Sequence, residues 1–120
     1  MKLVIIESPL AGDYENNREY AKRCMKDSLA RGEAPYASHL LFAQEGILDD
    51  TNEQERELGI EAGLAWGKCA ELTALYIDLG VSPGMQRGIK RALAEGRPVE
   101  IRSLNKTLPP GIRIEKEGRA

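Results

Sequence analysis

The sequence is poor in the residues that build disulfide frameworks and metal sites. Two cysteines and one histidine occur among its 120 residues. Cys24 and Cys69 each lie in a stretch with a helical pattern, and two cysteines do not make a framework, so we expect two reduced, partly buried thiols. One histidine and two distant cysteines do not provide the ligand spacing of a zinc site. We therefore expect neither a structural disulfide nor a bound metal.

Long apolar runs and an excess of charge are also missing. The apolar run near the N-terminus, residues 3–6, is too short for the core of a signal peptide and is not followed by a small-residue cleavage site. No stretch approaches the roughly 20 apolar residues of a membrane helix. A formal net charge of -2, from 17 basic and 19 acidic residues, provides no field that would hold a polyanion. We expect a cytoplasmic protein without a membrane or nucleic-acid partner.

The sequence does not contain the best-known nucleotide-binding motifs. It has no Walker lysine pattern and no complete GxGxxG motif, so a standard nucleoside-triphosphate or dinucleotide site is not expected. We also expect no cofactor.

What the sequence does have is an alternation of short apolar runs with amphipathic segments. A chain with 42% hydrophobic residues and this length suits one domain. The patterns predict strands at 3–6, 34–37, 72–77 and 99–102, and helices at 13–30, 51–69 and 85–95. This order implies right-handed crossovers, and thus a single Rossmann-like α/β domain of three layers with four or five mainly parallel strands. We assign it to residues 1–104, and residues 105–120 to a turn-rich extension with a short edge strand near 112–114.

Three glycines recur at a spacing of four in the second long helical segment. Gly59, Gly63 and Gly67 therefore share one face, which we expect to pack closely against the sheet or another subunit. Trp66 and Tyr76 are expected in the core or at an interface, because large aromatic side chains usually bury area.

Two loops are the candidate ligand-binding segments. In a doubly wound sheet, ligands bind outside the carboxyl ends of the strands, near the point where strand order reverses. Both loops combine small residues with a following helix N-terminus, where free backbone N–H groups hold phosphate or carboxylate groups. The same sequences are also ordinary turns and helix starts. The candidate ligand-binding residues are Ser8, Pro9, Gly12, Asp13, Ser82, Gly84 and Met85, with Arg87 close enough to the second helix start to approach a phosphate.

His39 and several carboxylates are the candidates for proton transfer. His39 follows the second strand at the same edge of the sheet, and histidine suits proton transfer near neutral pH. A purely structural role for it is equally consistent with the sequence. The acidic residues near strand ends are Glu7, Asp13, Asp49, Asp50 and Asp78. Of these, Asp13 also suits a helix cap, Asp49 and Asp50 a solvated loop, and Asp78 a strand end; we take His39, Asp50 and Asp78 as the catalytic candidates.

An ordered set of motifs resembles a known group of proteins. They are Ser8-Pro9-Leu10-x-Gly12-Asp13, Asn17, Ala37-Ser38-His39-Leu40-Leu41-Phe42, Leu48-Asp49-Asp50, Glu55-Arg56-Glu57-Leu58-Gly59 and Ser82-x-Gly84-Met85. Together, over about residues 3–102, they resemble the nucleoside 2-deoxyribosyltransferase-like superfamily, in particular its small phage and bacterial branch. The resemblance implies a Rossmann-like domain that binds a nucleoside or nucleotide and assembles as a homo-oligomer.

The resemblance also implies a catalytic residue that this sequence lacks. In active relatives, a glutamate just inside the helix after the glycine-containing loop attacks the anomeric carbon of the sugar. Gly88 stands at that position. Glycine costs roughly 1 kcal/mol of helix propensity relative to alanine, so we expect a small residue there to make room for something. Either catalysis is lost and the pocket only binds, or another carboxylate has taken over.

Three functional hypotheses follow. The leading one is a nucleoside- or nucleotide-binding protein that sequesters a nucleotide signal, with Ser8, Gly12, Ser82, Gly84 and Met85 as the phosphate or ribose cradle and His39 near the base or sugar. The second is a diverged N-glycosidase or deoxyribosyltransferase that uses another carboxylate. The third is an oligomeric interaction module whose loops bind nothing.

Overall fold

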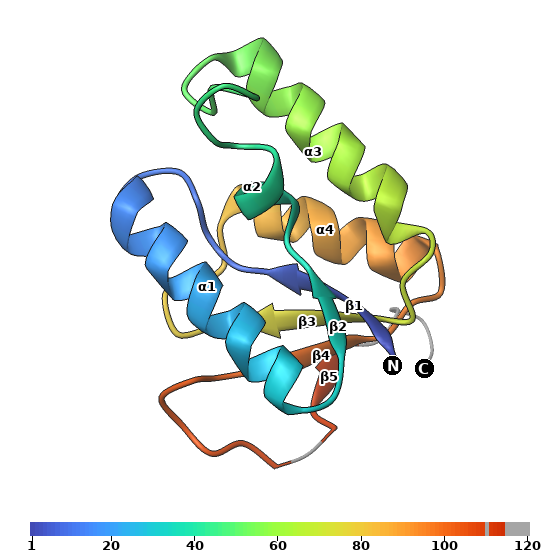
Figure 1. Cartoon of the computed structure of the whole chain (residues 1–120). Coiled ribbons are helices and arrows are strands. Elements are labelled where there is room, and N and C mark those ends of the chain that lie inside the picture. The colour runs from blue at the N-terminus through green and yellow to red at the C-terminus, as the bar shows by residue number, and fades with distance from the viewer. Residues whose placement is uncertain (110, 115–120) are drawn as a thin grey trace.

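The computed structural model describes residues 1–109 and 111–114 of the protein. Its elements in chain order are β1 (Leu3–Glu7), α1 (Tyr14–Ala30), β2 (Ala34–Tyr36), α2 (Ser38–Leu41), α3 (Glu53–Gly67), β3 (Leu72–Tyr76), α4 (Pro83–Ala94), β4 (Val99–Arg102) and β5 (Arg113–Ile114). The predicted strands and long helices are therefore present within a few residues of their expected bounds. The short helix α2, which the sequence pattern did not predict, precedes the expected loop (Figure 1). None of the described helices has the length and apolar character that a membrane span requires.

One sheet organises the domain. It has 5 strands in the order β2-β1-β3-β4-β5. The first four are parallel, and β5 pairs antiparallel with β4. The chain moves from β1 to one side for β2 and then returns to the other side for β3, so the strand order reverses between β1 and β3. The predicted mainly parallel α/β sheet and its edge strand are confirmed.

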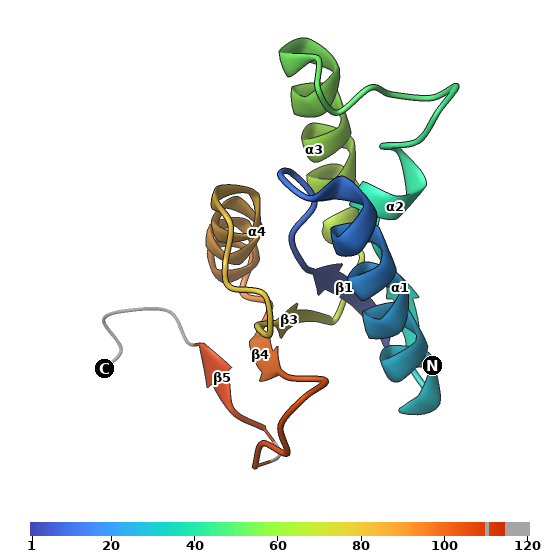
Figure 2. The ribbon, with the colours of Figure 1, turned by 90° about the vertical axis from the view of Figure 1, so that its left-hand side faces the viewer.

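Helices α1 and α4 cover opposite faces of this sheet (Figure 2). The core beneath α1 includes Val4, Ile6, Tyr20, Cys24 and Tyr76, and the core beneath α4 includes Leu75, Met85, Ala92 and Val99. Successive side chains of a strand point to opposite faces, so Ile5 and Glu7 of β1 lie on the α4 side. The three-layer arrangement is as predicted.

Helix α3 packs mainly against α2 and α4 and extends beyond the sheet (Figure 1). Its glycines serve these contacts: a Cβ at Gly63 would lie 2.5 Å from the Ser38 Cβ, and one at Gly59 would lie 3.2 Å from Leu48 Cδ1. Of the two neighbours expected for the glycine face, the sheet is therefore not the one found at Gly59 and Gly63, and contact with another subunit stays a prediction. Gly67 instead admits the Arg97 side chain, whose Nη2 would be 3.3 Å from an added Cβ.

Two side chains differ in exposure from the expected pattern. Both cysteines are free thiols, but only Cys24 is buried, and Cys69 is exposed just beyond the end of α3. Tyr76 is fully buried as predicted, whereas Trp66 is 61% exposed on α3. An interface role for Trp66 stays a prediction.

Candidate functional site

A cavity lies over the carboxyl end of β1. Its volume is about 190 Å³, and its lining residues come from β1, β2, α2, α3 and α4. It forms because α3 is held away from the sheet by α2, which leaves the α4-side face of β1 uncovered. It therefore lies beside the point where strand order reverses, where α/β sheets bind their ligands.

The carboxyl group of Glu7 occupies a notch in α4 at Gly88. Glu7 is the last residue of β1, and both residues line the cavity. Gly88 is buried, and a Cβ added to it would overlap the Glu7 carboxyl group. The expectation that a small residue at position 88 makes room for another group is thus confirmed. That group is a carboxyl from a different element.

The surroundings of Glu7 favour the neutral form of its carboxyl group. The side chain is half-buried, and no described residue donates a hydrogen bond to it. Burial raises the pKa of Glu7 to about 8, although the positive charge of Arg97 opposes the shift. Arg97 is itself held at the cavity floor, where its guanidinium group donates to Thr73 Oγ1 at 3.0 Å and to the Gly67 carbonyl at 2.6 Å. At neutral pH, Glu7 is therefore largely protonated and can donate a proton.

His39 and Ser8 form a hydrogen-bonded pair in the same cavity. His39 is in α2, and Ser8 directly follows β1; Ser8 Oγ lies 2.7 Å from His39 Nε2. Burial lowers the pKa of His39 to about 4, so the imidazole is neutral at physiological pH. A neutral ring can accept from the Ser8 hydroxyl or donate to it, depending on the tautomer. The pair can thus orient a ligand hydroxyl or a water without carrying charge.

Two further polar groups of the cavity have no hydrogen-bond or ion-pair partner in the part of the chain that the structure describes. The Oη of Tyr36, at the end of β2, is buried without a hydrogen bond to any described atom. Arg56, in the first turns of α3, is half-buried and forms no ion pair with residues 1–109 or 111–114. Buried polar groups are nearly always satisfied in native proteins, so the Tyr36 hydroxyl is an exception that calls for a partner, whereas the half-exposed Arg56 can be solvated. The sequence analysis missed both, although Tyr36 ends a strand at the predicted ligand edge.

The start of α4 offers little for an anion. Ser82 is the N-cap and its Oγ accepts from the Met85 N–H at 3.2 Å. Pro83 has no N–H, so only the Gly84 N–H of the first three helical positions remains for a ligand. Ser82, Gly84 and Met85 all line the cavity as the sequence predicted.

Several predicted ligand residues lie outside the cavity lining. Pro9, Gly12 and Asp13 belong to the connection to α1, where Gly12 has a φ of 105° and Asp13 caps the helix by accepting from the Asn16 N–H at 3.3 Å. Arg87 points to α3 and donates to both carboxylate oxygens of Glu57, at 2.9 and 2.7 Å. The cap reading of Asp13 is confirmed.

The two acidic candidates, Asp50 and Asp78, are in different environments. Asp50 lines the cavity and accepts from Tyr14 Oη at 2.9 Å. Asp78 follows β3 away from the cavity and accepts from Tyr20 Oη at 2.6 Å and the Leu104 N–H at 2.8 Å. Burial would raise the pKa of Asp78, but these hydrogen bonds and one from Ser103 outweigh it and lower the pKa to about 2. Asp78 therefore joins α1, β3 and the segment after β4.

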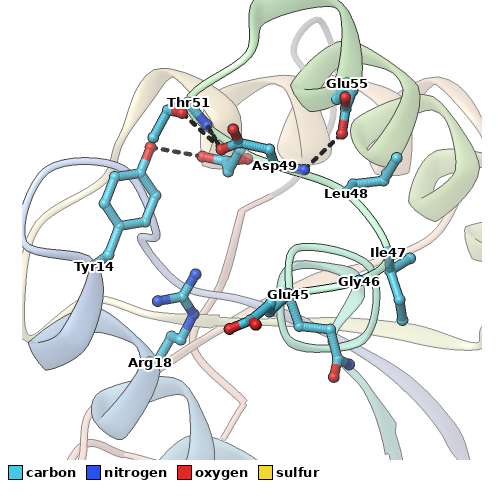
Figure 3. Close-up of a pocket in the computed structure, with 11 residues that line it drawn as sticks. Tyr14, Arg18, Glu45, Gly46, Ile47, Leu48, Asp49, Thr51 and Glu55 are labelled. Atoms are coloured by element: carbon cyan, nitrogen blue, oxygen red, sulfur yellow. Dashed lines mark hydrogen bonds between the residues drawn. The ribbon is translucent and has the colours of Figure 1, made fainter.

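A wider groove adjoins the cavity through Asp50. It has a volume of about 580 Å³ and runs between the start of α1 and the loop at 44–51 (Figure 3). Tyr14 and Arg18 form one wall, with the Arg18 guanidinium carbon 5.5 Å from the centre of the Tyr14 ring. On the other wall, Glu55 accepts from the Asp49 N–H at 2.7 Å, and Asp49 in turn accepts from Thr51. This groove and the cavity share Asp50 as a lining residue.

The fold defines a class of protein, and comparison with a solved structure agrees. The structure is similar to a 2-deoxyribosyltransferase from Bacillus psychrosaccharolyticus with a TM-score of 0.59 and 16% identity, covering 89% of this chain and 77% of that one. A CMP N-glycosidase from Clostridium botulinum, BcmB, aligns with a TM-score of 0.48 and 16% identity, covering 88% and 71%. The likeness to the 2-deoxyribosyltransferase shows that the chain has the deoxyribosyltransferase-like Rossmann fold that its motifs predicted.

The sequence family is shown directly. The family model described as a domain of unknown function, DUF7768, matches residues 2–102, and the chain belongs to this family. No curated protein sequence matches the chain.

Proposed function

We propose that the protein binds a nucleoside or nucleotide in the cavity over β1, in the cytoplasm. The observation that carries this proposal is the buried Tyr36 hydroxyl, which has no hydrogen-bond partner among residues 1–109 and 111–114, together with the Glu7 carboxyl and the Arg56 guanidinium, which line the same cavity. A ligand with both hydrogen-bonding and anionic groups satisfies all three. The likeness of the fold to a 2-deoxyribosyltransferase supports a nucleoside as the common part of the ligand.

The positions of these groups suggest how the ligand lies. Arg56, at the outer side, suits a phosphate, because an unpaired guanidinium offers a fork of N–H donors to phosphate oxygens. Ser8 and His39 lie deeper and suit a sugar hydroxyl. The predicted cradle of Ser8, Ser82, Gly84 and Met85 is retained in the proposal, with Arg56 added as its main cation and Gly12 outside the cavity lining.

The test is direct binding with recovery of the ligand. Purified protein is incubated with nucleosides, nucleoside monophosphates and cyclic nucleotides, and bound and free compounds are separated by chromatography. We expect one compound to bind and to be recovered, and the Tyr36→Phe variant to bind it about tenfold more weakly, because a hydrogen bond is lost in a dry site. Lys106→Ala, far from the cavity, is the control. Absence of binding across the panel would favour the interaction-module hypothesis.

A second candidate function is cleavage or transfer of the N-glycosidic bond. The specific observation that favours it is the Glu7 carboxyl group in the Gly88 notch, because a largely protonated carboxyl in a ligand cavity can take part in acid catalysis. Release of free base by the wild-type protein separates this function from sequestration of an unmodified nucleotide signal.

A further inference from the structure

The position of Glu7 is maintained by features that a merely structural glutamate does not need. It ends β1 and projects into the cavity, where it forms no ion pair with residues 1–109 or 111–114. The facing helix carries glycine at position 88, where any side chain would collide with the carboxyl group. Two elements are thus adapted to one another so that a carboxyl group stands unpaired inside the cavity.

The charge state of this carboxyl group suits one role. Burial holds the pKa of Glu7 near 8, so that most molecules carry the proton at pH 7. The neighbouring imidazole of His39 is neutral at that pH and is engaged with Ser8 at 2.7 Å. Of Glu7 and His39, Glu7 is therefore the group that carries a proton it can donate near pH 7.

We infer that Glu7 is the catalytic acid of an N-glycoside hydrolysis carried out in this cavity, an inference that rests on the proposed nucleoside or nucleotide binding. The Glu7 carboxyl donates its proton to the departing base as the bond between the anomeric carbon and the base nitrogen breaks, and that nitrogen keeps the bonding electron pair. A water molecule then bonds to the anomeric carbon, and its surplus proton returns to the Glu7 carboxylate. The products are the free base and the sugar or sugar phosphate, and Glu7 is restored.

The first experiment uses 2'-deoxyadenosine, 2'-deoxycytidine and their 5'-monophosphates as probes. Release of adenine or cytosine is followed by chromatography, and binding of the same compound by calorimetry. We expect Glu7→Gln to lower the rate of base release about 100-fold or more, the usual contribution of a general acid, while the Kd changes less than about threefold. Glu19→Gln, an exposed glutamate of α1, is the matched control and keeps the wild-type rate.

A second variant tests the notch itself. Gly88→Ala leaves Glu7 in the sequence but displaces its carboxyl group, so we expect base release to fall about tenfold or more with the fold intact by circular dichroism. Gln86→Ala, exposed on the same helix, is the control. The pH profile gives an independent readout, because a proton donor is lost as pH rises and release must decline above about pH 8.

Each contrary result has a distinct meaning. Binding of a probe without base release by the wild-type protein overturns the role of Glu7 and leaves the proposed binding function standing. Base release that survives in Glu7→Gln, or that rises through pH 8, also overturns the role. Failure of all four probes to bind overturns the role of Glu7 toward these nucleosides, and absence of binding across the wider panel removes the binding function on which the inference rests.

Discussion

At the scale of single residues, burial of the Glu7 carboxyl group makes the stability of the protein depend on pH. Its pKa is about 8 in the folded chain and close to 4.5 when exposed. Between these values, the folded state holds a proton that the unfolded state has lost, so the free energy of unfolding falls as pH rises from about 4.5 to 8. Below about pH 4.5, the buried Glu7 carboxyl group has little effect on the free energy of unfolding.

The Glu7→Gln variant removes this cost. We expect its free energy of unfolding to exceed that of the wild type by about 2 kcal/mol at pH 8 and to be nearly equal at pH 5. The value at pH 8 is smaller than the full pKa shift would give at about 1.36 kcal/mol per unit, because the cavity is open to solvent. Urea unfolding at both pH values measures the difference. An equal effect at both pH values would show that the native carboxyl group titrates normally.

Arg56 is expected to decide between a nucleotide and a nucleoside. Its guanidinium group lines the cavity and has no ion pair within the described chain, so it can pair with a phosphate at no cost to another contact. We expect Arg56→Gln to weaken binding of a nucleoside monophosphate about tenfold and that of the matching nucleoside less than about twofold. Arg23→Gln, exposed on α1, is the control. Equal weakening of both ligands would place the phosphate elsewhere.

Some site residues could be predicted because their position next to a strand is enough to place them. Others were missed because their role depends on contacts between distant parts of the chain. Ser8 and His39 lie directly after predicted strands, which is enough to place them at the ligand edge. The lack of a partner for Tyr36 and Arg56 is a property of the folded chain alone. Arg87 shows the reverse case: its phosphate role was predicted from the helix start, but Glu57, 30 residues earlier, pairs with it.

At the scale of elements, the separation of α2 and α3 is fixed by a single glycine. A Cβ at Gly63 would lie 2.5 Å from both Cβ and Oγ of Ser38. We expect Gly63→Ala to push α3 away from α2 and to destabilise the protein by about 2 kcal/mol, as overpacking usually does. The double variant Gly63→Ala with Ser38→Gly removes the collision and is expected to recover at least half of the loss in thermal unfolding. Purely additive effects would contradict this account.

On the α1 side of the sheet, Asp78 connects elements in the way that Gly63 does on the side of α2 and α3. Its carboxylate accepts hydrogen bonds from Tyr20, Ser103 and the Leu104 N–H. We expect Asp78→Asn to destabilise the protein by about 2 kcal/mol, because an amide cannot accept all of these bonds. The native pKa of about 2 lies below the usual 3.8, so the contribution is present above that value and is lost as pH falls toward 2. Acid unfolding curves of variant and wild type measure this, and unchanged ligand binding would separate Asp78 from the site.

Element positions were predictable where the pattern is periodic and short in range. The strands β1 and β3 are largely apolar runs, β4 alternates apolar and charged residues, and α1 and α4 have one apolar face each, so their layers follow from the sequence. The place of α3 does not follow, because its glycine face permits close packing against any neighbour. The existence of α2, four residues long, decides which neighbour it is and thereby opens the cavity.

At the scale of the whole molecule, the outer face of α3 is the candidate for contact with a second copy of the chain. Trp66 is 61% exposed and Leu58 60% exposed, both on the helix that extends beyond the sheet. The Trp66 ring lies 6.2 Å from that of Tyr36, which lines the cavity. Association through this face would bury a large aromatic side chain and complete the packing around the α3 wall of the site.

The homo-oligomer that the sequence predicts can therefore be tested at Trp66. By light scattering, we expect the wild-type protein to show the mass of two or more chains of 13.3 kDa. We expect Trp66→Lys to shift this mass toward that of one chain, because a charge in an apolar contact carries a desolvation cost. Leu29→Lys, exposed on α1 at 52%, is the matched control and is expected to keep the wild-type mass. Since Tyr36 adjoins Trp66, the monomeric variant is also expected to bind ligand more weakly. A wild-type mass of one chain would instead assign Trp66 to the wall of the site alone.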